Sequence, residues 1–293
     1  MSPSTLHRVS YRDLALRSLD QLPPFSPILN HLMASLADED VSFARLAAVI
    51  ERDSVLSGNV LRLVNSALYG RRGTVSSVRA AVAVLGMVRL RNYLLGFSVA
   101  RLWDKARTPA GWSMERFNNH SVAVAVLSDI LVQKTTADYA EGAFVAGLLH
   151  DLGRLMIAIA LPEEFAQISV AQRVSGMPLE KCEQEHLEVT HSELSAAALA
   201  RWSLPEPIRR AVLYHHRSDM NAAAPVRSGA HPLSRVVECA DEVAKSLGYS
   251  ILDADNQRAK PVPEVLARLG LEQRSSEISE AFASELGTVL ASF

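Results

Sequence analysis

Apolar residues recur along the chain at intervals of three and four positions, and strictly alternating stretches are scarce. The first spacing puts apolar side chains on one face of an α-helix, whereas alternation would put them on one face of a strand. Ala, Leu, Arg and Glu, which favour helices, dominate the periodic segments. The pattern therefore predicts an all-α protein.

The first region, residues 1–107, is predicted to form an N-terminal helical subdomain. Periodic segments run to about Leu36, through residues 43–53, and from Val55 to Gly70, a candidate C-terminal cap. The long apolar stretch at 78–103 predicts two helices that are broken near Gly86.

Two further regions follow a predicted linker, "TPAGWS", at 108–113. Residues 108–250 continue in helices from about Met114 to Leu247, which predicts a helical bundle. "DADNQRAKPVP" is a polar connection, and two last helices near 262–269 and 274–291 give a C-terminal extension, 251–293.

Polar residues interrupt the inner faces of the helices in the second region. His120 is in phase with Ala123 and Leu127, on the inner face. His150 and Asp151 end the apolar run of "AFVAGLLHDLGRLM". A carboxylate there should be paired, cap the next helix, or bind a metal, because a desolvated lone charge costs several kcal/mol.

More histidines and a second acid follow at helix ends and on an inner face. Thr190 and Glu193 form a capping-box pattern, which puts His191 in a first helical turn with its ring free to face a cleft. His215 and His216 end "PEPIRRAVLYHHRSD" in a predicted last turn, where histidines favour the helix dipole. Asp241 lies on the buried side of its helix. Alone, each residue fits an ordinary core, surface or boundary position.

Together these residues form an ordered series of His, His-Asp, His, His-His and Asp on separate helices. Neutral imidazoles and carboxylates suit Zn, Fe, Mn or Ni. A carboxylate among several histidines can bridge two ions, and such a pair can generate hydroxide and hold a phosphate for in-line attack.

The bulk composition excludes some classes of protein. With 48% apolar and 21% charged residues and a net charge of −2, the chain is predicted to be globular, with nucleic-acid binding disfavoured despite basic residues in "YGRRGTVSSVR" and "MVRLRN". Cys182 and Cys239 lie far apart, which fits a reducing compartment. No signal peptide, apolar window of spanning length, P-loop or nucleophile elbow is recognised, so a cytoplasmic protein is expected.

The order of these residues resembles that of the HD superfamily of metal-dependent phosphohydrolases. From about Leu22 to Leu247, over three quarters of the chain, the sequence resembles the HDOD family of bacterial signalling proteins. The resemblance is carried by "LPPFSPILNHLM", "LAAVIERDSVLSGNVLRLVNSALYG", "VSSVRAAVAVLGMVRLRNYLLG", "HSVAVAVLSDIL", "AFVAGLLHDLGRLMIA", "HSELSAAALARWSLPEPIRRAVLYHH" and "VVECADEVA". It implies an N-terminal helical part packed on an HD-type helical bundle.

The resemblance also implies site residues. The superfamily's metal-binding quartet corresponds to His120, His150, Asp151 and Asp241. The additional histidines of the cyclic-dinucleotide phosphodiesterase branch, the HD-GYP branch, correspond to His191, His215 and His216.

Two departures from that branch concern catalysis. The branch has a lysine after its His-Asp pair, where this chain has Arg154, which keeps the positive charge but is a poor proton donor. The Gly-Tyr-Pro loop after the paired histidines is replaced by "RSDMNAAAPVRSG".

These features predict a regulatory protein, more a binding module than an enzyme, with one or two divalent metals in a retained pocket. The expected partners are signalling proteins in trans, with a nucleotide or cyclic dinucleotide as a further candidate ligand. The alternative is a metal-dependent phosphohydrolase in which Asp151 bridges two ions and Arg154 steadies phosphate charge. Oligomeric state stays open.

Overall fold

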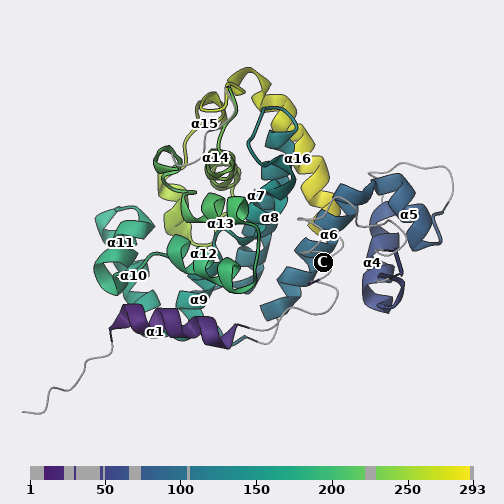
Figure 1. Ribbon diagram of the computed structural model, residues 1–293. Helices are drawn as coiled ribbons and strands as arrows, with labels where there is room; N and C mark the ends of the chain where they lie inside the picture. The colour runs from purple at the N-terminus through teal and green to yellow at the C-terminus, as the bar shows by residue number, and fades with distance from the viewer. Residues whose placement is uncertain are drawn as a thin grey trace, which may run out of the picture.

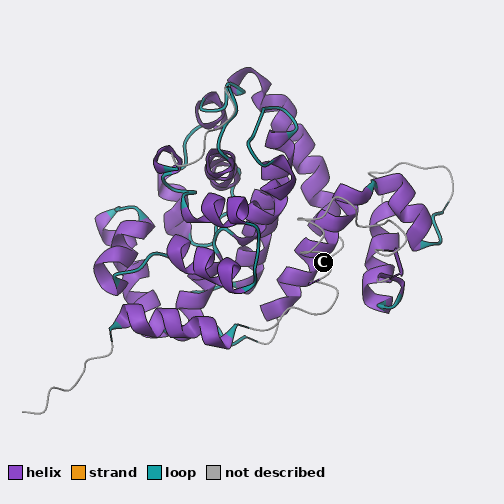
Figure 2. Ribbon diagram, viewed as in Figure 1, coloured by secondary structure: helices purple, strands orange, loops and turns teal. Residues whose placement is uncertain are grey.

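The computed structural model describes residues 10–22, 30, 47–48, 50–65, 74–103, 106–221 and 229–290. In these ranges the regular structure is helical (Figure 2), and strand-like pairing is confined to one bridge between Ala137 and His231. The predicted all-α class is confirmed.

The N-terminal elements occupy two separate places. They are α1 (Tyr11–Arg17), η1 (Ser18–Gln21), α4 (Ser54–Val64), α5 (Val78–Leu85), α6 (Met87–Ala100) and η3 (Arg101–Trp103). Helices α4 and α5 lie to one side and are joined to the bundle by α6, which packs on α8 (Figure 1). Helix α1 instead packs against α9 and α11, where Arg12 donates a hydrogen bond to the carbonyl oxygen of Glu188 at 2.6 Å. The first helix is therefore part of the bundle's outer layer.

The bundle and the C-terminal extension contain the remaining elements. They are α7 (Met114–Val132), η4 (Ala140–Gly142), α8 (Ala143–Leu149), α9 (Leu152–Ala160), α10 (Pro162–Ser175), α11 (Leu179–Leu187), α12 (His191–Arg201), α13 (Glu206–Leu213), η5 (Ser218–Met220), α14 (Leu233–Ser246), η6 (Asp253–Arg258), α15 (Val262–Ala267), η7 (Glu272–Arg274) and α16 (Ser275–Leu290). Helix α7 lies at the centre, against α8, α14 and α16. Every residue from 120 to 128 in it is buried, which explains its apolar character on all sides.

Two glycines let the helices around the His-Asp pair approach closely. A Cβ at Gly147 of α8 would lie 2.7 Å from the carbonyl oxygen of Val124 in α7. A Cβ at Gly153 of α9 would lie 2.1 Å from the carbonyl oxygen of His191 in α12. Only glycine fits these contacts, so the positions of His120 and His191 relative to the His-Asp pair depend on Gly147 and Gly153.

The predicted helix ends agree with the structure at one position and differ at another. The break near Gly86 is confirmed, and this glycine has a φ of 76°, which suits glycine. Helix α4 ends at Val64 rather than at Gly70, because the side-chain amide of Asn65 exchanges two hydrogen bonds of 2.8 Å with the backbone of Val75. Gly70, the segment near Leu36 and most of 43–53 lie outside the described residues.

One continuous stretch, Ala140–Ala160, is long and apolar enough to cross a membrane, contrary to the expectation that no window reaches this length. The two helical segments Val78–Leu85 and Leu90–Trp103, which meet at a bend, are long and apolar enough to cross a membrane only if they are counted together as one span. In Ala140–Ala160, 89% of the apolar window is buried inside the protein, and the stretch contains His150, Asp151 and Arg154. This apolar run is therefore the core of the bundle.

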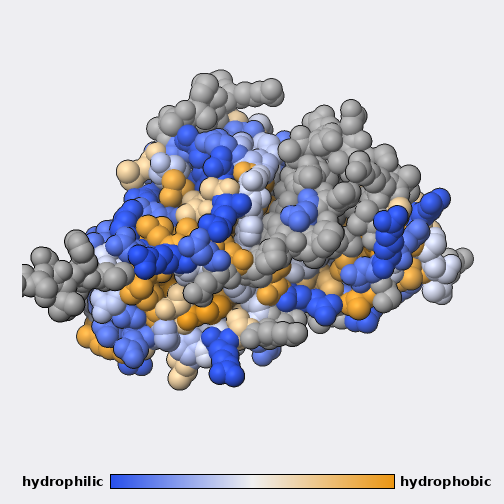
Figure 3. Space-filling model, turned by 60° about the horizontal axis from the view of Figure 1, so that its bottom comes forward, coloured by the Kyte–Doolittle hydropathy of each residue, from blue (hydrophilic) through white to orange (hydrophobic). Residues whose placement is uncertain are grey.

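Outside the core, exposed large apolar side chains lie on several elements of the described chain. Figure 3 shows small apolar patches separated by hydrophilic residues on the face turned forward. The large exposed apolar residues include Tyr11 and Leu14 of α1 and Val170 and Val174 of α10. Dispersed residues of this kind are normal for a protein surface.

Candidate metal centre

The structure brings the seven predicted ligand residues together inside the bundle. They come from α7, the α8–α9 junction, the start of α12, the residues after α13, and α14: His120, His150, Asp151, His191, His215, His216 and Asp241. All are buried except His216, which is partly exposed. Their proximity is a structural fact, and their role as ligands stays a prediction.

Local structure explains how these side chains reach the centre. Asp151 stands at the N-cap position of α9, but its side chain makes no cap hydrogen bond and points to the histidines instead. The capping box of Thr190 and Glu193 is present and fixes His191 as the first residue of α12. The ring of His191 is fully buried rather than facing open space. His215 lies beyond α13, which ends at Leu213, so the predicted last helical turn is wrong there.

One half of the centre is formed by His120, His150 and Asp241. The Nε2 atoms of the two rings are 3.2 Å apart. Oδ1 of Asp241 lies 3.4 Å from Nε2 of His120 and 3.8 Å from Nε2 of His150. Oδ2 of Asp151 lies 3.5 Å from each of these two nitrogens. The two ring nitrogens therefore lie within 3.8 Å of one oxygen from each of two carboxylates.

The other half is formed by His191, His215 and His216. The Nε2 atoms of His191 and His216 are 3.0 Å apart. Oδ1 of Asp151 lies 3.2 Å from Nε2 of His191 and 3.6 Å from Nε2 of His215. Asp151 thus offers one oxygen to each half, which is the geometry of a bridging carboxylate.

The donor atoms fit transition-metal ions. Ligand atoms about 2.1 Å from one ion lie about 3–3.5 Å from one another, close to the distances given above. Nε2 of His215 and Oδ1 of Asp241 are buried and have no hydrogen-bond partner among the described residues. Buried polar atoms without a partner are costly, and an ion in each half would satisfy them.

The far sides of the rings hold them in the tautomer that a metal needs. Three rings have Nδ1 against a backbone carbonyl oxygen: His120 against Tyr249 at 2.9 Å, His150 against Gly147 at 2.7 Å and His215 against Val212 at 2.6 Å. A carbonyl oxygen only accepts hydrogen bonds, so each Nδ1 carries the proton. In the neutral ring the Nε2 lone pair then points into the centre.

The charges of the centre also favour ligand forms. Burial alone would raise the pKa of both carboxylates. His150 and Arg154 nevertheless hold the pKa of Asp151 well below its ordinary value. Lys245 and His150 do the same for the pKa of Asp241. Burial lowers the pKa of His215 and of His216. Both carboxylates are therefore ionised and both of these rings neutral at pH 7.

His191 differs from these rings. Against the effect of burial, Glu183 and Asp151 raise the pKa of His191 to about 10. An ion in this half must therefore displace the His191 proton, as metal binding to protonated ligands generally does.

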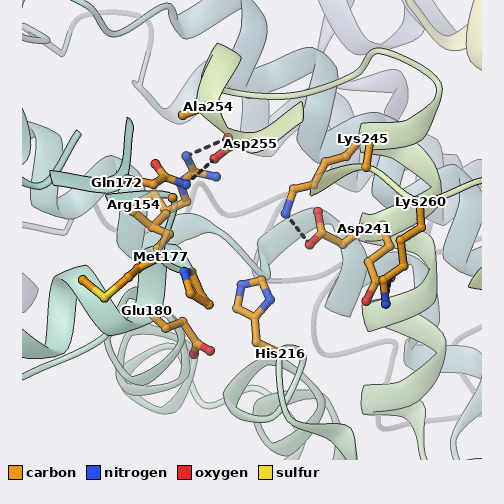
Figure 4. A pocket seen from close by; sticks show the side chains of 15 residues that line it. Arg154, Gln172, Met177, Glu180, His216, Asp241, Lys245, Ala254, Asp255 and Lys260 are labelled. Carbon is orange, nitrogen blue, oxygen red and sulfur yellow. Dashed lines mark hydrogen bonds and ion pairs between the residues drawn. The ribbon is translucent and has the colours of Figure 1, made fainter. Parts of the chain in front are cut away.

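A cleft of about 280 Å³ opens onto the centre at His216 and Asp241 (Figure 4). Its walls come from α9, the α10–α11 connection, the start of α11, α14, η6 and the residues after η6. They carry three basic and three acidic residues: Arg154, Lys245 and Lys260, and Glu180, Glu242 and Asp255.

Arg154, the predicted phosphate-contacting residue, is buried in the wall of this cleft. Its Nη1 donates to Oδ2 of Asp151 at 3.2 Å, and its Nη2 donates to Oδ2 of Asp255 at 2.9 Å. These carboxylates raise the pKa of the guanidinium above its ordinary value despite its burial. Arg154 thus neutralises charge at Asp151, the carboxylate that faces both halves.

Sequence reasoning missed three residues around the centre. Lys245 donates to Oδ2 of Asp241 at 2.6 Å, and its spacing of four positions from Asp241 on α14 could have indicated the pair. Glu183 contacts His191, and Asp255 contacts Arg154 from the segment that the sequence predicts to be a polar connection. No local pattern marks these two residues, because their partners come from other elements.

Comparisons with known proteins agree with the resemblance. The sequence model of the HDOD domain family matches residues 22–218. An uncharacterized protein of Treponema pallidum (strain Nichols) is 27% identical over 203 residues. This match covers 68% of the chain, and the chain spans only 38% of that relative's length.

Solved structures show the same fold. An HDOD domain protein of unknown function from Geobacter sulfurreducens has a TM-score of 0.71 at 26% identity, over 93% of this chain and 98% of that one. A proposed phosphohydrolase from Shewanella amazonensis has a TM-score of 0.72 at 22% identity, over 94% of this chain and 98% of that one. A proposed signal transduction protein from Marinobacter aquaeolei has a TM-score of 0.73 at 19% identity, over 95% and 65%. The last two likenesses show the fold alone.

Proposed function

The chain belongs to the HDOD domain family, and we propose that it is a bacterial regulatory module that holds metal in its His/Asp centre without turning over a substrate. Its output is the binding of a signalling protein in trans, and the metal is a structural or sensing element. A cytoplasmic location is part of the same proposal.

The main support for this proposal is that two basic side chains beside the centre, Arg154 and Lys245, are already ion-paired with carboxylates. Arg154 is buried with both ends of its guanidinium ion-paired, to Asp151 and to Asp255. Lys245 is paired with Asp241. Because an arginine does not release its proton near neutral pH, Arg154 is no proton donor for a leaving group. Its charge stabilises the ionised centre instead.

The ligand residues would hold one ion between His120, His150, Asp151 and Asp241, and a second between Asp151, His191, His215 and His216. Bound ions of this kind polarise ligands and lower the pKa of bound water. The protein itself fixes the rings through their Nδ1 hydrogen bonds and excludes water from six of the seven side chains.

A metal-dependent phosphohydrolase is the second candidate, and the cleft favours it. The cleft reaches His216 and Asp241, and Lys245 and Lys260 in its walls could hold a phosphate. In this alternative the substrate is a nucleotide or a cyclic dinucleotide, and Arg154 steadies phosphate charge after leaving Asp255.

One experiment separates the two candidates. Protein purified without a chelating column is analysed for metal, loaded with Fe, Mn or Ni, and assayed against nucleotides and cyclic dinucleotides beside His150→Ala. The regulatory proposal expects that the wild-type protein contains metal. It also expects that the wild type hydrolyses these substrates no faster than His150→Ala does. Turnover at ordinary enzymatic rates that disappears in His150→Ala would refute it and support the phosphohydrolase. Metal-free protein that takes up none of these ions would refute the metal-holding role.

A further inference from the structure

Glu183, a buried residue of α11, contacts the centre through His191. Its Oε2 accepts two hydrogen bonds from that residue, one from the backbone N–H at 2.8 Å and one from Nδ1 of the ring at 2.7 Å. The carboxylate therefore fixes both the start of α12 and the orientation of the His191 ring.

This contact is chemically different from those of the other rings. His120, His150 and His215 have Nδ1 against a neutral backbone carbonyl oxygen. A carboxylate carries a full negative charge, and a charge-assisted hydrogen bond is roughly twice as strong as a neutral one. A ring that donates to a carboxylate is a more basic ligand through its other nitrogen.

We propose that Glu183 is a positioning residue that gives the His191–His215–His216 half of the centre its metal affinity, whereas the His120–His150–Asp241 half does not depend on it. The inference rests on the proposed metal-holding function. It adds that the affinity of the second half is controlled by one carboxylate outside the ligand set.

The chain supplies a matched control on the same pair of helices. Oε1 of Glu180 accepts a hydrogen bond from Oγ of Ser192 at 2.5 Å, so Glu180 also links α11 to the first turn of α12. Its partner is a serine hydroxyl rather than a ring of the centre. A variant of Glu180 disturbs the helix pair in the same way but leaves the support of His191 intact.

The test is the metal content of the full chain in Ni²⁺ buffered at several free concentrations. We compare wild type, Glu183→Gln and Glu180→Gln by equilibrium dialysis with elemental analysis, and locate the ions by anomalous diffraction. The glutamine in Glu183→Gln keeps an oxygen that can accept from His191, which protects the fold while removing the charge. Circular dichroism verifies folding of each variant.

The expected result is that wild type holds an ion in each half, and that Glu183→Gln binds Ni²⁺ about 10- to 100-fold more weakly in the His191 half alone. Glu180→Gln is expected to match wild type. Unchanged affinity in Glu183→Gln, or equal losses in both variants, would overturn the inference while leaving the metal-holding function intact. A wild type with no Ni²⁺ in either half would contradict the proposed function and this inference together.

Discussion

Arg154 and Asp255 stand 101 positions apart in the chain and form a buried ion pair with 2.9 Å between Nη2 and Oδ2. The same guanidinium donates to Asp151, the carboxylate shared by both halves of the centre. Asp255 also accepts hydrogen bonds from Gln172 of α10 and from the backbone N–H of Leu252. The C-terminal extension is thereby coupled to the middle of the centre.

Asp255→Asn is expected to destabilise the protein strongly. The substitution leaves Arg154 buried with one ionic partner removed, and breaking a buried pair costs about 3–5 kcal/mol. Urea unfolding measures the loss. Asp253→Asn is the control on the same short helix, because its carboxylate is 94% exposed and its pair with Arg116 is worth about 0–1 kcal/mol. Equal effects of the two substitutions would show that the buried pair is unimportant.

Gly153→Ala is expected to separate α9 from α12. The new Cβ would lie 2.1 Å from the backbone oxygen of His191, and such overpacking costs about 1–3 kcal/mol. We expect a lower midpoint of thermal unfolding and weaker metal binding in the His191 half. Gly287→Ala in α16, where a Cβ meets nothing within 4 Å, should instead stabilise the helix by up to about 1 kcal/mol. A Gly153→Ala protein as stable as wild type would contradict the close approach.

Metal removal is expected to lower the free energy of unfolding. A ligand that binds only the native state at 100 times its Kd adds about 2.7 kcal/mol, and a chelator abolishes this term. Thermal unfolding with and without the chelator measures it, and His150→Ala should reduce the difference. His186→Ala is the control, since His186 of α11 bonds the carbonyl oxygen of Cys182 and lies outside the centre. The same melting temperature with and without the chelator would count against bound metal.

Cys239 is expected to resist alkylation in the native protein. Burial raises the pKa of its thiol to about 12, so the reactive thiolate is scarce at pH 8–9. Because the unfolded thiol ionises near pH 9 and the folded one does not, this group lowers stability as the pH rises above about 9. Iodoacetamide labelling with peptide mapping, in buffer and in urea, provides the measurement. Rapid labelling of Cys239 in buffer at pH 8 would contradict its burial.

Much of the helical architecture was predictable because it depends on local spacing. The three-and-four periodicity identified α7 to α14 as helices, and the break at Gly86 and the capping box at Thr190 followed from local residue preferences. The end of α4 was not predictable in this way. It depends on a pairing between Asn65 and Val75, which are ten positions apart in the sequence.

The candidate ligands were predictable for a different reason. Each of His120, His150, Asp151 and Asp241 is a polar residue on an otherwise apolar helical face or run, which makes it conspicuous in the sequence. His191, His215 and His216 were added by their order along the chain and by the resemblance. The binding of metal by these seven residues remains a prediction. The division of the chain into three regions also remains a prediction.

The sequence by itself determined the helical class and the family and made the candidate ligand residues conspicuous, because periodicity and residue type are local properties of the chain. The tertiary structure decided which oxygen of Asp151 faces which half, since only packing assigns Oδ2 to the His120 half and Oδ1 to the His191 half. It also decided the engagement of Arg154 by Asp255 and of His191 by Glu183. These partners are brought together by long-range folding, and no spacing along the chain encodes the contact.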